Sequence, residues 1–257
     1  MSLAGIEMSH HPHTRAPVSQ SMRPKAIDLF AGPGGLSLGL ERAGFDVIAA
    51  IEWDKAAGET YRNNFDHPSY QRDISKLAPQ EFRQALEREK IISEGERISL
   101  IAGGPPCPGF SLIGRSKISD LIKKGEYGES REYRHRFIDD PRNQLFREFV
   151  KYVQEFQPDY FLMENVSGMT SYVLDEDPIV DIIRSSFTGY EVKWRVLDAS
   201  EFGVPQSRKR IFFIGSRTGN VHPEFPEPTN TERNKISTLE AILDLSLAKP
   251  SSDGLIR

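Results

Sequence analysis

Short apolar runs alternate with stretches of helical periodicity along most of the chain. The first such unit is KAIDLF (25–30), the glycine cluster AGPGG, the helical stretch LSLGLERAGF (36–45) and the apolar run DVIAAIEW (46–53). This order of strand, glycine turn, helix and strand is a βαβ unit. Further strands are predicted at 98–104, 159–165, 191–199 and 209–216, and further helices at 54–65, 79–90, 143–156 and 178–187. The pattern predicts an α/β fold, with a mostly parallel sheet covered by helices on both faces.

Three segments break this alternation. Residues 1–23 lack any apolar periodicity, and we expect a disordered leader in which His10, His11 and His13 are solvated. Residues 111–142 hold eight Lys or Arg and six Asp or Glu, so a functional lid or a disordered loop is expected there. Residues 218–257 are rich in Pro, Thr and Asn, with one helical stretch at 237–248. The predicted domains are therefore the leader, a catalytic domain over 24–217 and a C-terminal linker segment over 218–257.

The composition excludes several classes of protein and site. The 33 basic and 37 acidic residues give a net charge of -4, so any nucleic-acid site must be a local basic face. A single cysteine, Cys107, excludes an internal disulfide and a cysteine-based zinc cluster. No apolar run approaches the roughly 20 residues that span a bilayer, and the first residues do not form a secretory signal. We expect a cytoplasmic protein without a membrane or metal site.

The glycine turn after the first strand is the first candidate site. Ligands of open parallel sheets bind beyond the carboxyl ends of the strands, and glycine allows close approach of the backbone. Gly32, Gly34 and Gly35 stand there, and Glu52 follows at the end of the second strand, where a carboxylate can accept bonds from a ribose. The alternative is a tight strand-to-helix turn with a surface glutamate. The spacing also differs from the dinucleotide fingerprint GxGxxG, which disfavours a nicotinamide dehydrogenase.

The lone cysteine is the second candidate. Cys107 lies in GGPPCPGFS (103–111), after a buried strand, and Pro105, Pro106 and Pro108 stiffen the backbone around it. Such a loop could hold a nucleophile in one position. The alternative is a small buried apolar residue, which is the commonest state of a free cysteine.

An acid and two arginines complete the set. Glu164 and Asn165 end the apolar run FLMENV, and an acid there is costly unless it is paired or used. Burial would raise its pKa and let it hold a proton near neutrality; the alternative is a cap for the following helix. Arg208 and Arg210 occupy alternate positions entering a strand, which suits anion binding or base recognition, or simply a solvated edge.

Taken together and in this order, these motifs resemble the cytosine-C5 methyltransferase family over about residues 25–217. DLFAGPGG resembles the family's cofactor motif, IEWD its acidic motif, and RDI (72–74) the motif that binds adenine. GGPPCPGFS resembles the catalytic PPCQxFS motif, while ENV and QSRKR match two further motifs. The resemblance implies a Rossmann-like S-adenosylmethionine-dependent methyltransferase fold. It also implies a DNA (cytosine-5-)-methyltransferase of the kind found in restriction–modification.

The resemblance also implies the site residues. S-adenosylmethionine is expected as cofactor and S-adenosylhomocysteine as product, with duplex DNA carrying a flipped cytosine as partner. Cys107 would attack carbon 6, Glu164 would contact ring nitrogen 3, and Arg208 and Arg210 would hold the base and the loop. The cofactor residues are expected to be Phe30, Ala31, Gly32, Gly34, Gly35, Leu36, Glu52, Trp53, Asp73, Ile74, Pro105 and Leu145. Arg115, Lys117, Lys123 and Lys124 lie in the loop that would close on DNA.

The chain departs from the family pattern in two residues and in its C-terminal part. Pro108 replaces a glutamine and Asp198 replaces an asparagine, and neither change removes a reacting group. We expect no target-recognition domain after the QSRKR strand, although STLEAILDL resembles the link that precedes one. A second polypeptide that carries target recognition and the remaining motifs is therefore expected, unless the chain is a truncated product.

Two other functions stay open. The first is a tRNA cytosine-5 methyltransferase, which would share the catalytic motifs and differ only in substrate. The second is a non-catalytic subunit that binds S-adenosylmethionine, against which Cys107, Glu164 and Arg208 argue. For the DNA enzyme, the expected location is the bacterial cytoplasm or nucleoid.

Overall fold

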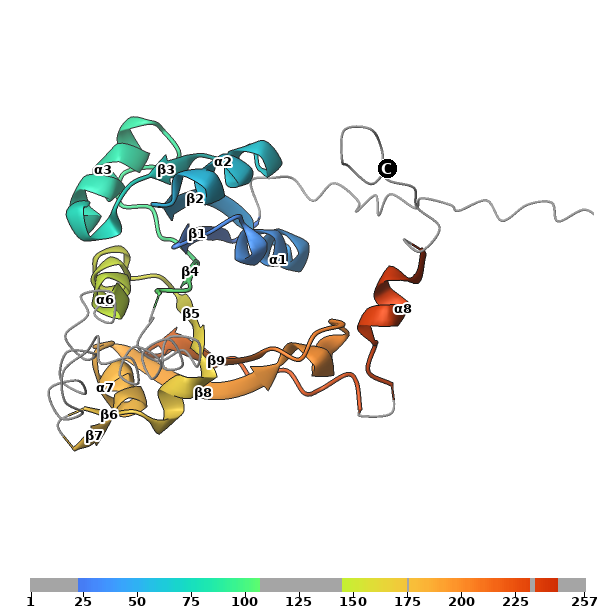
Figure 1. Cartoon of the computed structure of the whole chain (residues 1–257). Coiled ribbons are helices and arrows are strands. Elements are labelled where there is room, and N and C mark those ends of the chain that lie inside the picture. Colours follow the sequence, from blue (N-terminus) through green and yellow to red (C-terminus); the bar gives the residue numbers. More distant parts are fainter. Residues whose placement is uncertain (1–22, 107–144, 175, 232–233, 245–257) are drawn as a thin grey trace, which may run out of the picture.

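A seven-stranded sheet with the order β3-β2-β1-β4-β5-β9-β8 forms the centre of the protein (Figure 1). The computed structural model describes residues 23–106, 145–174, 176–231 and 234–244. The strands are β1 Lys25–Leu29, β2 Asp46–Glu52, β3 Ser69–Gln71, β4 Leu100–Gly103, β5 Tyr160–Val166, β8 Tyr190–Asp198 and β9 Lys209–Arg217. Residues 1–22 of the predicted leader (1–23) and the loop at 111–142 fall outside the described residues, so the expectations for them remain predictions.

Strand direction divides the sheet into two parts. Neighbouring strands from β3 to β5 pair in parallel, whereas β9 runs antiparallel to both β5 and β8. The carboxyl ends of β1, β2, β4 and β5 therefore meet at one edge. The prediction of a mostly parallel α/β sheet is confirmed.

The larger core lies between the sheet and the helices α3 (Pro79–Arg88), α6 (Leu145–Phe156) and α7 (Ile179–Ser185). In α6 the spacing of Phe149, Tyr152, Val153 and Phe156 places all four side chains on one buried face. They pack with alternate residues of the strands, such as Phe161. Burial of each large side chain contributes about 1.5–3 kcal/mol to folding.

The opposite face of the sheet carries α1 (Gly35–Ala43) and α2 (Lys55–Asn64). Leu40 of α1 packs with Ala26 and Ala102, which alternate with the strand residues of the larger core. Tyr61 of α2 packs with Ala31 and Ala50. Helices therefore cover both faces, as the sequence predicts, and α1 and α2 lie beside the turn that follows β1.

The remaining elements are short. A second sheet pairs β6 (Val173–Leu174) with β7 (Asp177–Pro178), and a helix α8 (Thr238–Ile242) lies to one side of the main sheet (Figure 1). Helix α8 covers the first part of the stretch predicted at 237–248, and residues from 245 onward are outside the described part. Among the described helices, none has the length and apolar character needed to cross a membrane.

Candidate functional site

The turn between β1 and α1 is built from residues with left-handed backbone conformations. Phe30, Gly32 and Gly34 have φ values of 58°, 57° and 101°. Glycine is required at position 34 for a second reason, because a β-carbon there would lie 2.1 Å from the Phe65 ring. Phe30 is not a glycine, and a left-handed conformation in such a residue stores strain that concentrates at functional sites.

Glu52 ties this turn to the end of β2. Its Oε2 accepts a hydrogen bond from the Gly32 N–H at 2.7 Å, and its Oε1 accepts one from the Asp54 N–H at 2.7 Å. The Ala31 N–H also donates to the Ile51 carbonyl at 3.1 Å. The structure thus brings the glycine turn and the Glu52 carboxylate together.

A hollow of about 510 Å³ lies next to Glu52, at the ends of β2 and β3. Trp53 and Asp73 both line it, and the Trp53 side chain is 69% exposed. Asp73 Oδ1 accepts from the Ser75 N–H and hydroxyl, and these bonds together with Lys76 hold the pKa of Asp73 below its usual value. An exposed indole beside a fixed carboxylate suits an aromatic ring that carries an amino group.

The other predicted cofactor residues occupy different depths. Ala31 and Ile74 are buried, with Ile74 in the larger core, whereas Gly35 is exposed at the start of α1. Leu36 and Leu145 are half-buried. Leu145 packs against the larger core, and Leu36 packs against the cluster around Leu40 on the opposite face of the sheet.

The segment after β4 lies against the end of β5. A β-carbon on Gly103 would lie 2.3 Å from the Leu29 carbonyl oxygen, and one on Gly104 would lie 3.2 Å from Glu164 Oε2. Asn165 Nδ2 donates to the carbonyl of the buried Pro105 at 3.0 Å. The loop that leads toward Cys107 is therefore held beside Glu164. Cys107 itself lies outside the described residues, which end here at Pro106.

Glu164 is paired rather than used as a helix cap. Arg210 Nε lies 2.8 Å from Glu164 Oε1, and Arg210 reaches it from the adjacent antiparallel strand β9. Burial raises the pKa of the Glu164 carboxyl, and the positive charges of Arg210 and Arg208 partly offset this increase. A half-buried carboxyl with a raised pKa holds a proton more readily than an exposed one, which suits a group that donates or accepts a proton.

Arg208 and Arg210 line the same hollow as Glu164, of about 350 Å³. Arg208 is positioned by Asp198, whose Oδ1 accepts from the Arg208 N–H at 3.0 Å and whose Oδ2 accepts from the Ser207 hydroxyl at 3.1 Å. The N–H and hydroxyl of Ser200 also donate to Asp198 Oδ1, and these bonds lower the pKa of Asp198 to about 2. Asp198 thus closes the 199–208 loop between β8 and β9.

The sequence alone assigns no role to Asn165 or Asp198. Asn165 adjoins Glu164 in the ENV motif, and Asp198 appeared only as a departure from the family pattern. Both side chains are polar and buried. Because buried polar side chains need hydrogen-bond partners, this combination identifies the two residues as structurally important.

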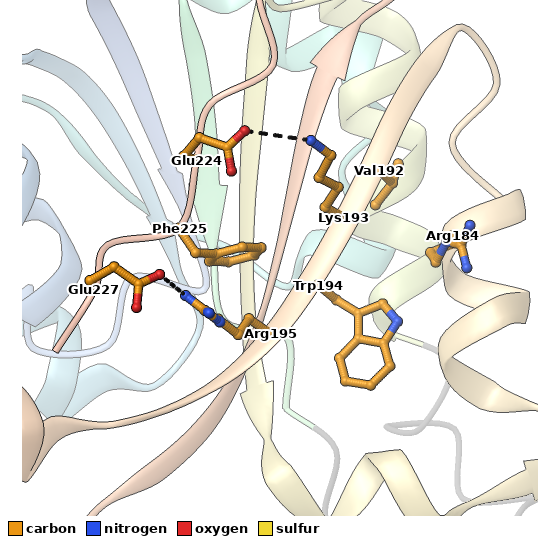
Figure 2. Close-up of a pocket in the computed structure, with 8 residues that line it drawn as sticks. All are labelled: Arg184, Val192, Lys193, Trp194, Arg195, Glu224, Phe225 and Glu227. Carbon is orange, nitrogen blue, oxygen red and sulfur yellow. Dashed lines mark hydrogen bonds and ion pairs between the residues drawn. The ribbon is translucent and has the colours of Figure 1, made fainter.

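A further hollow, of about 430 Å³, lies at the outer strand β8 (Figure 2). Its cations are paired with carboxylates: Lys193 with Glu224, and Arg195 with Glu227. Arg184, also in this hollow, pairs with Asp181. These paired charges leave no reactive group comparable to Glu164.

Residues 24–254 match the family of C-5 cytosine-specific DNA methylases. The chain is 38% identical over 211 residues to the type II methyltransferase M1.HphI of Haemophilus parahaemolyticus, which covers 82% of this chain and 50% of that protein. It is 34% identical over 228 residues to the type II methyltransferase M.AquIA of Picosynechococcus, which covers 85% of this chain and 82% of that protein.

Solved structures agree with these matches. A prophage-encoded E. coli protein described as a DNA modification methyltransferase superposes with a TM-score of 0.62 at 30% identity, over 89% of this chain and 56% of that one. The S. pombe Dnmt2 methyltransferase, at 22% identity and a TM-score of 0.53, shares the fold. The chain spans about half the length of several curated relatives, with 50%, 44% and 53% of three of them covered.

Proposed function

The chain belongs to the C-5 cytosine-specific DNA methylase family, and from this we propose that it methylates carbon 5 of cytosine in DNA, within a restriction–modification system. The observation that carries the proposal is the environment of Glu164. This carboxyl is paired with Arg210 and faces the segment that leads to the lone cysteine. A DNA substrate would place the reaction in the bacterial cytoplasm or nucleoid.

We propose that S-adenosylmethionine binds over the glycine turn. Open space around the missing β-carbons of Gly32 and Gly35 allows a ligand to approach the backbone there. Glu52, held by two backbone N–H groups, would accept bonds from ribose hydroxyls, and Trp53 and Asp73 would receive the adenine. The proposed set also includes Phe30, Ala31, Gly34, Leu36, Ile74, Pro105 and Leu145. When bound, the cofactor supplies an electrophilic methyl group on a positively charged sulfur.

Catalysis would depend on three kinds of side chain. The Cys107 thiolate would bond to carbon 6 of an extruded cytosine, which makes the poorly nucleophilic carbon 5 reactive. Glu164 would hold a proton at ring nitrogen 3 and so stabilise the charge that this attack creates. Arg210 would fix Glu164, and Arg208 would add positive charge beside the base. Carbon 5 would then take the methyl group, which would leave the cofactor as the neutral thioether. Loss of the carbon 5 proton to a base and departure of the thiolate would complete the reaction.

The domain division is also a proposal. Residues 24–217 would form the catalytic and cofactor-binding unit, 1–23 a leader and 218–257 a linker. Target recognition would be carried by a second polypeptide. That polypeptide would correspond to the part of the longer relatives that this chain does not match. The chain covers 82% of M.AquIA, against about half of the longer relatives.

Covalent trapping tests the proposed reaction. The chain, alone and co-expressed with its neighbouring reading frames, is incubated with S-adenosylmethionine and duplex DNA containing 5-fluorocytosine. Carbon 5 then carries fluorine and cannot lose a proton, so a DNA adduct at Cys107 should accumulate and should be absent from Cys107→Ala. Trapping on tRNA and not on DNA would favour the RNA enzyme. Cofactor binding without trapping on either nucleic acid would favour a non-catalytic subunit.

A further inference from the structure

A series of hydrogen bonds runs from Asp28, in the strand before the glycine turn, to the surface of the protein. Ser37 Oγ donates to Asp28 Oδ2 at 2.6 Å, and the Ser37 and Tyr61 hydroxyls lie 2.6 Å apart. The Tyr61 hydroxyl lies 2.5 Å from His67 Nε2. On its other side, His67 Nδ1 is 3.5 Å from Glu41 Oε1. Four elements contribute to this chain: β1, α1, α2 and the segment before β3.

The inner end of the chain is deeply buried. Asp28, Ser37 and Tyr61 are each 0% exposed. Asp28 Oδ1 has no hydrogen-bond partner within the described part of the chain. His67 and Glu41 at the outer end are only half-buried. A buried carboxyl with one unpartnered oxygen is costly when charged, so its connection to the surface requires an explanation.

The hydrogen bonds can point in either of two directions, and the two states differ by one proton, which enters or leaves at His67. With Asp28 ionised, Ser37 donates to Asp28, Tyr61 to Ser37, and His67 Nε2–H to Tyr61. With Asp28 protonated, every bond can reverse, so that Tyr61 donates to His67 Nε2 and His67 carries its proton on Nδ1, facing Glu41. The tautomer of His67 therefore reports the charge of Asp28.

Asp28 is placed to influence the proposed cofactor site. It lies two residues before Phe30, and the hydroxyl of Ser37, in the first turn of α1, donates to its carboxyl. Glu52, which holds Gly32, is close enough to act on Asp28 electrostatically. The negative charge of Asp28 would favour a cationic ligand over a neutral one, because charges interact strongly in a buried environment.

Resting on the proposed cofactor site, we propose that Asp28 sets the preference of this site for the cationic sulfonium cofactor over its neutral thioether product, with its proton carried along Ser37, Tyr61 and His67. Asp28 touches no reacting atom, so it acts as a positioning and specificity-determining residue. Ionised Asp28 favours the cofactor, and protonated Asp28 removes this preference.

The titratable groups around these hydrogen bonds determine how the charge of Asp28 depends on pH. The pKa of Asp28 is raised to about 7, mainly by burial and to a lesser extent by Glu52, while Ser37 opposes the increase. Burial lowers the pKa of His67, against the opposing effect of Asp46 and Asp66. Burial also raises the pKa values of Tyr61 and Glu41, and Arg23 acts on Glu41 in the opposite direction. Asp28 thus changes charge near neutral pH.

Calorimetry with S-adenosylmethionine and S-adenosylhomocysteine tests the preference between pH 6 and 8.5. In the unmodified protein the ratio of the two affinities should shift toward the cofactor by on the order of tenfold as pH rises. Asp28→Asn should give a ratio independent of pH, while the exposed control Asp181→Asn should behave like the unmodified protein. A ratio that does not change with pH while both ligands bind would refute the inference but not the proposed function. Failure of both ligands to bind would refute the cofactor site and the inference with it.

Nitrogen NMR of the histidine imidazoles tests the hydrogen-bonded connection without any ligand. The signal that is lost in His67→Gln is the one that belongs to His67. The His67 tautomer should switch between its Nδ1–H and Nε2–H forms near pH 7. The switch should be lost in Asp28→Asn and in Tyr61→Phe, and retained in the control Tyr70→Phe, whose hydroxyl bonds to Glu89 instead. A switch that persists in Asp28→Asn would show that His67 titrates independently of Asp28. The proposed connection between the two residues would then be wrong.

Discussion

Two glutamates at the carboxyl ends of strands are held in opposite ways. Glu52, at the end of β2, accepts hydrogen bonds from the backbone N–H groups of Gly32 and Asp54. Glu164, in β5, is held by the side chain of Arg210. The path of the chain therefore fixes Glu52, whereas a charged and titratable partner fixes Glu164. The first arrangement suits a site that binds, and the second suits a site that moves protons.

The surroundings of the two residues extend this contrast. Around Glu52 the turn depends on positive φ values and on missing β-carbons, above all at Gly34. Around Glu164 the key contacts are polar side chains, namely Asn165 on Pro105 and Asp198 on the 199–208 loop. Substitutions should accordingly change binding and stability in the first region, and rate and pH profile in the second.

The largest effect is expected from Glu164→Gln. The amide keeps the shape of the side chain but cannot transfer a proton, so methyl transfer should slow by about 10²–10⁴-fold. Cofactor affinity should stay unchanged, because the glycine turn is not disturbed. Single-turnover transfer of labelled methyl groups with the complete enzyme measures the rate, and Glu148→Gln on the surface of α6 is the matched control. An unchanged rate would remove Glu164 from the mechanism.

Gly34→Ala should affect stability more than chemistry. The new β-carbon would meet the Phe65 ring at 2.1 Å, and φ at this position is +101°. Strain and overpacking together should lower the free energy of unfolding by about 2–4 kcal/mol. Gly39→Ala in α1 is the control, since its β-carbon would meet nothing within 4 Å, and it should stabilise by about 0.5–1 kcal/mol. Urea denaturation measures both, and equal values for the two variants would contradict the role given to the turn.

The same contrast explains what could be predicted from sequence. Turn-forming glycines and apolar runs are local signals, and they predict the glycine turn, Glu52 and the strand of Glu164. The observed β2, Asp46–Glu52, ends within one residue of the predicted 46–53. The strand β3 was not predicted, because three residues carry no periodicity and only pairing with β2 defines them. The contacts of Asn165 with Pro105 and of Tyr61 with Ser37 join residues 60 and 24 positions apart. Only the packed fold determines such contacts.

Asn165→Asp should have an intermediate effect. The amide donates to the Pro105 carbonyl, and a carboxylate there would place two acceptors against each other in a buried position. The free energy of unfolding should fall by about 1–3 kcal/mol, and methyl transfer should slow because the segment before Cys107 loses its anchor. Asn64→Asp is the control, since its amide also donates to a carbonyl but at the surface. Equal losses in the two variants would show that the Pro105 contact has no special importance.

The smallest effect at neutral pH is expected from Asp198→Asn. The amide oxygen can still accept the three bonds from Ser200 and Arg208, and the Nδ2 group can donate to the Ser207 hydroxyl, so stability should fall by less than about 1 kcal/mol. Asp198→Ala removes all four bonds and should cost about 2–3 kcal/mol.

Acid separates Asp198→Asn from the unmodified protein. The folded-state pKa of Asp198, about 2, lies below its unfolded value, so ionised Asp198 stabilises the fold above about pH 4. This contribution disappears as pH falls toward 2, and the asparagine variant has no such contribution to lose. Thermal unfolding between pH 2 and 7 should therefore show the two proteins converging in acid. A constant difference across that range would mean that hydrogen-bond geometry alone, and not the charge of Asp198, closes the 199–208 loop.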